Sequence, residues 1–304
     1  MTDDVVARAA RVLREGGVVA IPTETVYGLA ADVGNAAAIA RVYAIKGRPA
    51  DHPLIVHVRD VDALAGYVAD VTPRLRALAE AFWPGPLTAI VARGPRTPLA
   101  VTGGQETVAV RVPAHPLARA ILTAFGGALA APSANRFGRI SPTAAEHVRA
   151  DLGDEIDLIV DGGPAQVGVE STIVDLTGEV PAVLRAGAIT PTQLGEALGT
   201  AVVTRVGGTV RAPGTLRSHY APRARLVLAD AAAREDEARR RSARGERVAV
   251  LTLPDDPATA ARTLYATLRA LDADGYDTIV AALPRDTEAN AAVRDRLSRA
   301  AAPP

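Results

Sequence analysis

The pattern of strands and helices changes at one place in the chain, and this change constrains the fold more than any other feature. Before about residue 200, short apolar strands and helices mix without strict alternation. Residues 200–223, TAVVTRVGGTVRAPGTLRSHYAPR, then lose this pattern and are interrupted by Gly and Pro. After them, strands and helices alternate regularly. The sequence therefore predicts a domain at 1–200, a linker at 201–222 and a smaller domain at 223–304.

The two domains are expected to be different kinds of α/β structure. In the first, strands such as GVVAIP, LIVHV, TVAVRVP and TIVDL occur among irregularly spaced helices, which favours an α+β fold with a twisted mixed sheet. In the second, RLVLAD, RVAVLTL and YDTIVAAL alternate with helices, which is typical of a small Rossmann-like parallel sheet. The second domain has no G-x-G-x-x-G turn, so we assign it no nucleotide.

Composition argues against several classes of protein. Thirty-four basic and 34 acidic residues cancel, so a general nucleic-acid-binding surface is not expected, although a local basic cleft remains open. The absence of cysteine excludes disulfides, thiolate metal sites and a cysteine nucleophile. The first residues do not resemble a signal peptide, and no apolar run approaches the ~20 residues of a membrane span. We expect a cytoplasmic protein with no membrane partner.

Loops rich in hydroxyl and basic residues indicate an anionic ligand. Open sheets usually bind ligands at strand ends. Hydroxyls and backbone N–H groups suit phosphate oxygens, and Arg binds phosphate or carboxylate through two parallel hydrogen bonds. Such loops all lie in the first 187 residues, mostly after a predicted strand: PTETVYGLA, KGRPADHPLIVHV, WPGPLT, TVAVRVPAHP, APSANRFGRISPT, DGGPAQVGVEST and LRAG.

Lys46 is the only lysine in the chain, and Arg supplies the remaining 33 of the 34 basic residues. A lysine kept in this background indicates a site that needs a compact point charge. The alternative is a chance survivor at a helix end, where a cation suits the helix dipole. Arg48 follows in a loop held by Pro49 and Pro53, so it could face the same ligand or be an ordinary surface arginine.

Polar residues interrupt two apolar strands. His57 in LIVHV could be a core histidine or a ligand contact. Arg111 in TVAVRVP is expected to be buried and therefore needs an anionic partner, either an internal Glu or a bound carboxylate or phosphate. Glu24 and Glu170 could be metal ligands or braces for their loops.

The stretch PSANRFGRISPT offers Ser133, Asn135 and Ser141 as ligand contacts or turn residues. Ser141 before Pro142 is also a good helix N-cap, so PTAAEHVRADL predicts a helix with Pro in its first turn. The chain has no Walker loop and no H-E-x-x-H or G-x-S-x-G motif.

In their order along the chain, these stretches resemble the YrdC/YciO-like family, specifically its longer two-domain members, the threonylcarbamoyl-AMP synthases. The linker piece APGTLRSHYAP is similar to the P-G-x-x-x-x-H-Y-A-P signature of those members. The resemblance covers nearly the whole chain and implies an α/β twisted-sheet catalytic domain with a large positive cavity. The other matching motifs are PTETVYGL, K-x-R-P-x-x-x-P-L-I-V-H, WPGPLT, T-V-A-V-R-x-P-A-H-P, PSAN, SPT, DGG, G-V-E-S-T and L-R-x-G.

The resemblance implies an activity and its partners. L-threonine and bicarbonate (or CO2) would form a carboxylated amine that attacks the α-phosphate of ATP, giving L-threonylcarbamoyladenylate and pyrophosphate. Mg2+ would be carried on the ATP phosphates, with no metal ligand from protein side chains. A separate tRNA threonylcarbamoyl transferase complex would then form threonylcarbamoyladenosine in tRNA, so stable direct nucleic-acid binding is not required of this chain.

The motif matches also imply roles for individual residues. At position 52 some members have Asn where this chain has His, and at position 217 some have an aromatic residue where this chain has Arg. Catalytic roles near the phosphates are implied for Lys46 and Arg48. Contacts with L-threonine are implied for Thr23, His57, Arg111 and Ser171. Contacts with ATP are implied for Arg48, His52, Thr107, Ser133, Asn135, Ser141 and Arg185, and linker matches are Ala212, His219 and Tyr220.

The linker is expected to fold across the site as a lid that shields the labile adenylate from water. Two other functions compete with this one. An RNA-binding or ribosome-maturation factor could use the same cavity for a phosphate backbone, but the neutral charge and 3% aromatic content disfavour it. A carbamoyl-adenylate chemistry for another acceptor occurs in hydrogenase-maturation proteins, whose zinc fingers a chain without cysteine cannot form.

Overall fold

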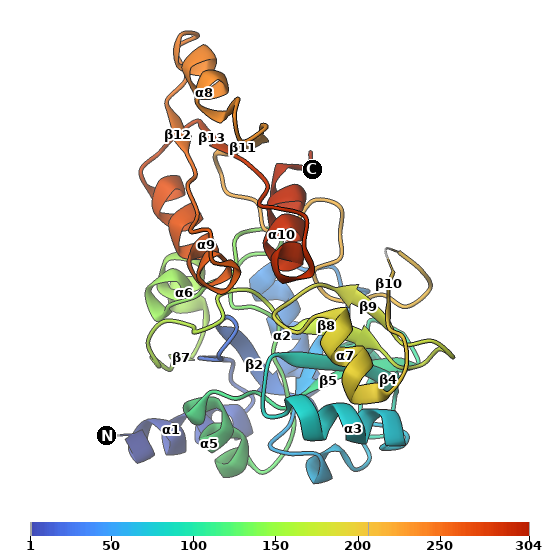
Figure 1. Cartoon of the computed structure of the whole chain (residues 1–304). Coiled ribbons are helices and arrows are strands. Elements are labelled where there is room, and N and C mark those ends of the chain that lie inside the picture. Colours follow the sequence, from blue (N-terminus) through green and yellow to red (C-terminus); the bar gives the residue numbers. More distant parts are fainter. Residues whose placement is uncertain (1, 206, 304) are drawn as a thin grey trace.

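Thirteen strands are found in the computed structural model, which describes residues 2–205 and 207–303 (Figure 1). They are β1 (Val19–Ile21), β2 (Gly28–Asp32), β3 (Ile55–His57), β4 (Leu87–Ala92), β5 (Thr107–Arg111), β6 (Leu129–Ala130), β7 (Leu158–Ile159), β8 (Thr172–Asp175), β9 (Ala182–Arg185), β10 (Val203–Thr204), β11 (Arg225–Leu228), β12 (Val248–Val250) and β13 (Thr278–Ala281).

Ten α-helices in the described residues connect these strands or flank them in the sequence. Several helices begin with Pro directly after a capping residue; Thr72 caps α3 in this way and Thr190 caps α7. The helices are α1 (Thr2–Arg14), α2 (Ala36–Lys46), α3 (Pro73–Phe82), α4 (Leu99–Thr102), α5 (Pro116–Phe125), α6 (Ala145–Leu152), α7 (Pro191–Leu198), α8 (Arg234–Ser242), α9 (Pro257–Ala273) and α10 (Ala291–Ala301), with 3-10 turns η1 (Asp62–Leu64), η2 (Gly153–Glu155) and η3 (Glu288–Asn290).

The strands form two separate sheets. The large sheet has the order β10-β9-β8-β4-β5-β3-β6-β2-β1-β7, and neighbouring strands in it are both parallel and antiparallel. The small sheet has the order β11-β13-β12, and both of its pairings are parallel. The predicted fold class, a mixed twisted sheet followed by a small parallel α/β unit, is confirmed. β10 lies inside the predicted linker, yet it pairs with β9 and extends the large sheet.

The two faces of the large sheet have different covers. Val56 and Val110 face the main apolar core, whereas their strand neighbours Ile55 and Ala109 pack with Ala212 of the linker. This is the alternation expected for strand side chains. The linker therefore lies over one face of the sheet. α1 packs on α5 and α3 packs on α7, and of these helices α1, α3 and α5 lie at the end of the large domain that is far from the small sheet (Figure 1).

The core of the C-terminal domain is continuous with loops of the first domain. Its cluster contains Ile279 of β13, together with side chains of α9 and α10. Val26, Ile140 and Val169 of the first domain belong to the same cluster, and so does Tyr220 of the linker. The two domains therefore share one apolar interface. In the described parts of the chain, no helix has both the length and the apolar character needed to cross a bilayer.

One local prediction is wrong. The helix expected to start at Pro142 starts at Ala145, and its N-cap position is Ala144. Ser141 is too far from the first helical residue to cap it, because the carbonyls of Pro142 and Thr143 accept from the N–H groups of Tyr27 and Ala165 and so belong to loop contacts rather than to the helix. The Ser141 hydroxyl donates to the Glu170 carboxylate at 2.5 Å.

The central position of Ile279 in the small sheet gives a stability prediction. Ile279 is fully buried on the middle strand, so Ile279→Ala should lower the free energy of unfolding by ~2–5 kcal/mol. Val203 is 43% exposed on the edge strand β10, and Val203→Ala should change it by only about 0.5 kcal/mol. Denaturant unfolding of both variants measures the contrast, and equal effects would contradict the assigned core.

Candidate active site

Strand direction brings four of the predicted residues to one edge of the large sheet. His57 ends β3 and Arg111 ends β5, and the two lie opposite each other on parallel strands. β4 is antiparallel to β5 and parallel to β8, so β8 starts beside the end of β5, with Ser171 just before it. β9 is antiparallel to β8 and ends with Arg185 at the same edge.

A β-bulge directs Arg185 to the site. Val183 lies opposite Val174, but Arg185 lies opposite Ile173, so Leu184 is an extra residue on β9. Val183 and Val174 face the main core, whereas Ile173 and Leu184 pack on the face covered by the linker. The extra residue thus reverses the alternation and places Arg185 on the linker side.

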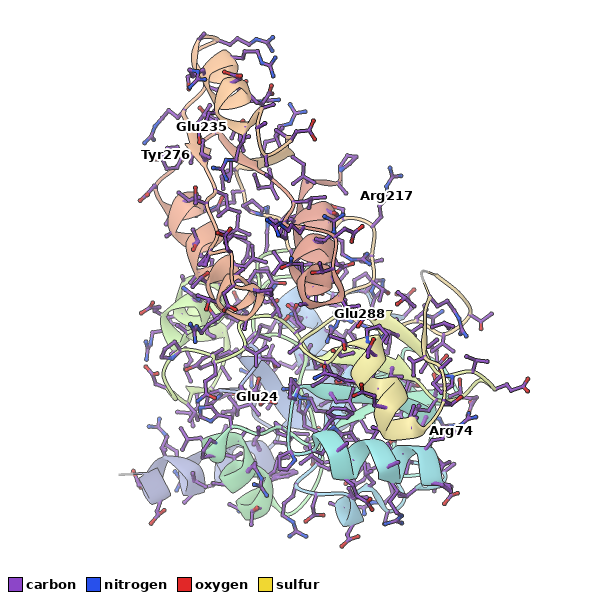
Figure 2. All side chains as sticks on the ribbon, viewed as in Figure 1. Glu24, Arg74, Arg217, Glu235, Tyr276 and Glu288 are labelled. Carbon is purple, nitrogen blue, oxygen red and sulfur yellow. The ribbon has the colours of Figure 1, made fainter. Side chains whose placement is uncertain are left out.

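Arg111 has an internal carboxylate partner, which is one of the two alternatives that the sequence left open. Its Nη2 donates to Glu24 Oε1 at 2.6 Å, its Nη1 donates to Thr25 Oγ1 at 2.9 Å, and its Nε donates to the Gly85 carbonyl at 3.2 Å. Both charged side chains are buried. Burial alone would raise the pKa of Glu24, but the adjacent Arg111 guanidinium brings it below its usual value. Glu24 is a brace in the interior of the large domain (Figure 2).

The Thr23 hydroxyl is fully engaged by its own loop. It donates to the Val26 carbonyl at 2.6 Å, so in the 2.9 Å contact with Thr25 it must be the acceptor. Thr25 in turn accepts from Arg111. The hydrogen bonds in this series therefore run in one direction, from Arg111 through Thr25 and Thr23 to the Val26 carbonyl. Thr23 lines the cavity with its hydroxyl proton already donated to Val26.

Arg48 and Arg185 differ from Arg111 because no carboxylate lies within ion-pair distance of either in the described residues. Arg48 donates to the Pro53 carbonyl at 2.8 Å, and Arg185 donates to the Ser171 carbonyl at 2.9 Å and to Ser171 Oγ at 3.0 Å. Burial lowers the pKa of Arg48 to about 10, and it lowers the pKa of Arg185 as well. Two desolvated cations thus lie in one cavity, and neither forms an ion pair with a described carboxylate.

Lys46 lies behind the cavity wall and does not line it. α2 ends at Lys46, and Gly47 turns the chain with φ 60°, a conformation that favours glycine. The Lys46 ammonium is buried and donates to the Ser133 and Asn135 carbonyls at 2.6 and 2.7 Å. Burial, and then the nearby Arg48 charge, lower its pKa well below the usual value.

The PSAN loop and its continuation are held by specific contacts. Ser133 lines the cavity, and Asn135 donates to the Arg136 and Arg139 carbonyls at 2.9 and 2.7 Å. Asn135 Oδ1 is buried with no hydrogen-bond partner in the part of the chain that the structure describes. It is a free acceptor, which water or a ligand N–H could satisfy.

His57 is a neutral imidazole with a defined tautomer. Burial, followed by the charge of Arg111, lowers the pKa of His57 to about 3. Its Nδ1 lies 3.2 Å from the Ile55 carbonyl, which can only accept, so Nδ1 carries the proton. Nε2 is therefore left as an acceptor in the cavity.

The linker forms the roof of the cavity. Tyr220 has a positive φ of 63°, unusual for a residue other than glycine, and its ring is buried. Its backbone N–H donates to His219 Nδ1 at 3.0 Å, so Nε2 of His219 carries the proton and can donate. Ala212 packs on the sheet instead of lining the cavity, and Arg217 is exposed on the outside of the linker (Figure 2).

The cavity has about 50 Å³ of free space, which is room for a few water molecules. Six predicted residues do not line it: Lys46, His52, Thr107, Asn135, Ser141 and Ala212. Nine do line it: Thr23, Arg48, His57, Arg111, Ser133, Ser171, Arg185, His219 and Tyr220. Their roles stay predictions.

Sequence reasoning missed several residues at the site. The sequence suggests Glu170 only as a metal ligand or a brace for its loop. In the structure it lines the cavity and accepts hydrogen bonds from three side chains. Thr88 is fully buried and shares a 2.7 Å hydrogen bond with Ser171. Thr88 and Thr25 lie in the motifs WPGPLT and PTETVYGL. A motif does not reveal which of its hydroxyls form hydrogen bonds to the residues of the site. No cluster of three acidic or histidine side chains that could hold a metal is present in the described chain.

The fold and the cavity together define an α/β protein with two sheets and a cavity, lined by buried arginines, beneath the linker between them. Comparison with known protein families identifies the family. The model of the Sua5, YciO and YrdC family, described as "Telomere recombination", matches residues 11–187. The model of the threonylcarbamoyl-AMP synthase C-terminal domain matches residues 189–302.

Whole-chain relatives agree with both models. Threonylcarbamoyl-AMP synthase from Bacillus subtilis is 39% identical over 98% of this chain and 93% of the relative, and the one from Pyrococcus abyssi is 37% identical over 96% and 92%. A crystal structure of the Pyrococcus abyssi Sua5 protein complexed with L-threonine matches with a TM-score of 0.93, at 36% identity, over 97% of this chain and 94% of that one. The chain belongs to the threonylcarbamoyl-AMP synthase family, and the predicted resemblance is confirmed.

The buried pair of Arg111 and Glu24 predicts a large loss of stability in Glu24→Gln. The substitution leaves the Arg111 charge buried and unpaired, so the free energy of unfolding should fall by ~3–5 kcal/mol. Glu106→Gln is the matched control, because the Glu106 side chain is 77% exposed in its pair with Arg93 and should cost at most about 1 kcal/mol.

The pair of Arg111 and Glu24 also predicts how the free energy of unfolding depends on pH. The pKa of Glu24 is lower in the folded state than its ordinary value of 4.5, so its stabilisation is full above that pH and is lost as the pH falls through the folded value. Glu24→Gln should therefore lose less stability on acidification than the wild type. Urea unfolding at a series of acidic pH values measures this, and parallel curves would contradict it.

Proposed function

We propose that this chain makes L-threonylcarbamoyladenylate and pyrophosphate from L-threonine, bicarbonate (or CO2) and MgATP. The observation that carries the proposal is the pair of buried guanidiniums, Arg48 and Arg185, which have only carbonyl and hydroxyl partners in the described residues. A buried cation is costly without an anion, and a triphosphate supplies several. The relatives that bear the synthase name support the same conclusion.

The other side of the cavity suits an amino acid. Arg111 makes three hydrogen bonds within the protein, so two of its five N–H groups remain for a carboxylate. Nε2 of His57 can accept from the amine. The Ser171 hydroxyl can pair with the substrate hydroxyl, and Thr23 lines the same wall. The L-threonine complex of the Pyrococcus abyssi relative supports this assignment.

The reaction then follows from these positions. The neutral threonine amine forms a bond to the carbon of CO2 and releases a proton, or to the carbon of bicarbonate with loss of water, and either route gives a carbamate. A carbamate oxygen then attacks the α-phosphorus of ATP. The bond from that phosphorus to the bridging oxygen breaks, and pyrophosphate leaves. Arg48 and Arg185 balance the negative charge that develops, as fixed cations do in phosphoryl transfer. In this proposal Mg2+ arrives bound to the phosphates of the MgATP substrate.

Lys46 has an indirect place in this scheme. Its ammonium holds the carbonyls on either side of the PSAN loop and adds positive charge behind Ser133, close to the triphosphate. A lysine suits this enclosed position, because its compact head fits between two carbonyls.

The linker acts as a lid. A space of about 50 Å³ cannot hold ATP, so Pro213, Gly214, His219 and Tyr220 must move to admit it. When they close again they exclude water, which would hydrolyse the mixed anhydride of the adenylate. The adenylate is then passed to a tRNA threonylcarbamoyl transferase complex, and this chain needs no stable contact with tRNA.

Mass spectrometry of reaction mixtures tests the activity. Purified protein with MgATP, bicarbonate and L-threonine should release pyrophosphate and form the adenylate, and omission of threonine should abolish both. L-valine, which lacks the hydroxyl, should be used at least 10³-fold less efficiently, because it leaves polar groups of the pocket unpaired. Salt-sensitive RNA binding without threonine-dependent pyrophosphate release would contradict the proposal.

Lys46→Arg tests the indirect role of this residue. The larger guanidinium does not fit between the two carbonyls, so the PSAN loop should shift and kcat should fall by about 100-fold, with a smaller change in KM for ATP. Arg41→Lys on the exposed side of the same helix is the control and should behave as wild type. Wild-type turnover in Lys46→Arg would show that this position does not need lysine.

A further inference from the structure

Glu170 is the meeting point of three parts of the chain. Its carboxylate accepts from Ser141 Oγ at 2.5 Å in the first domain, from the Tyr265 hydroxyl at 2.9 Å on α9, and from Arg296 Nε at 2.8 Å on α10. Glu170 is 6% exposed and lies directly before Ser171 in the cavity wall. Two of its three side-chain partners therefore come from the C-terminal domain.

Arg296 makes further contacts with the site. It is 1% exposed, although it is a charged residue on the last helix of the chain. Its Nη2 donates to the Ala186 carbonyl at 3.0 Å, next to Arg185, and its guanidinium carbon lies 5.0 Å from the centre of the Tyr220 ring. Asp295 binds its remaining nitrogen at 2.6 Å. One guanidinium thus touches the wall segment at Glu170, the wall segment at Arg185 and the linker roof.

Docking of the two domains does not by itself require this arrangement. The domains already share an apolar interface, and they share a second ion pair between Arg269 of α9 and Asp151 of α6, which does not line the cavity. A buried ion pair adds little net stability compared with apolar packing of similar volume. The position of the Arg296 pair, beside two residues of the proposed substrate site, indicates a role in the geometry of that site.

We propose that Arg296 is a positioning residue for adenylate formation, through which the C-terminal domain fixes the cavity wall: it holds the Glu170 carboxylate against Ser141 and the Ala186 carbonyl beside Arg185. Tyr265 assists as a second donor to Glu170. This inference rests on the proposed function, because it assigns Arg296 to the site where threonine and ATP would meet. Arg296 acts through other residues and does not contact substrate.

Charge explains why a cation is needed at this position. Burial alone would raise the pKa of Glu170, but Arg296, with Arg185 and the Ser141 hydrogen bond, lowers it to about 2. The other charged or titratable groups that face it are Lys46 from α2, His219 and Tyr220 from the linker, and Tyr265 from α9. Without Arg296, burial would raise the pKa of Glu170, and a protonated carboxyl would no longer hold Ser141 in the same way.

Kinetics of full-length Arg296→Met test the proposal. The uncharged side chain keeps most of the packing volume, and kcat for threonine-dependent pyrophosphate release should fall by about 100-fold with a smaller change in KM. Activity of the variant should fall further between about pH 8 and about pH 5, whereas the wild type should show no such decline from Glu170. The double variant Arg296→Met/Glu170→Gln has no carboxyl to titrate, so this acid decline should disappear.

Arg294→Met is the matched control. Arg294 lies on the same helix and binds Asp286 and the Pro284 carbonyl within its own domain. Its loss should leave kcat and the pH profile unchanged. Hydrogen exchange of backbone amides in residues 168–172 and 185–187 provides a readout that does not depend on activity, and it should be faster in Arg296→Met but not in Arg294→Met.

The outcomes separate the two proposals. If folded Arg296→Met shows the wild-type kcat, pH profile and exchange, Arg296 is not a positioning residue. If Arg296→Met does not fold, Arg296→Lys replaces it: the charge remains but the bond to Ala186 is lost, so slower turnover and faster exchange at 185–187 are expected, and wild-type values overturn the inference. If the wild type forms no adenylate, the proposed function fails, while the exchange comparison still decides whether Arg296 holds the wall.

Discussion

The free-energy cost of burying several positive charges in one place is the main constraint on this structure. Arg48, Arg111 and Arg185 all line one cavity, and Lys46 lies just behind it. Among these four cations, only Arg111 has a carboxylate partner in the described residues, and Glu170, the acid that lines the cavity, is already bound by Arg296. The other cations are satisfied by carbonyl and hydroxyl groups, and a ligand rich in negative charge would lower the remaining cost of their burial.

The mixed sheet allows so many cationic side chains to gather around one cavity. A purely parallel sheet would bring only the carboxyl ends of its strands to one edge. Here the antiparallel pairings of β4 with β5 and of β8 with β9 bring the start of one strand beside the end of another. Loops from widely separated parts of the sequence can therefore converge on one face, and the linker closes over them.

The sequence predicted the large features well for a physical reason. Apolar periodicity and the Gly- and Pro-rich break depend on local sequence, so the two sheets and the segment between them were predictable, as was the motif content of the cavity. The partners of charged residues were not. Glu24 as the partner of Arg111, and Arg296 as the partner of Glu170, are far apart in sequence, and no local pattern identifies them. Similarly, Ser141 matches the local pattern of a helix cap, but its side chain is bound to Glu170, which lies on another loop.

The apolar cluster shared by the two domains limits how the molecule can be divided. Val26, Ile140 and Val169 are covered by the C-terminal core, and they adjoin the loops of the cavity. A chain shortened to its first domain would expose this apolar patch to water beside the cavity. Exposed patches of this kind favour association with other proteins. The C-terminal domain is thus a permanent cover that keeps water away from the back of the cavity wall.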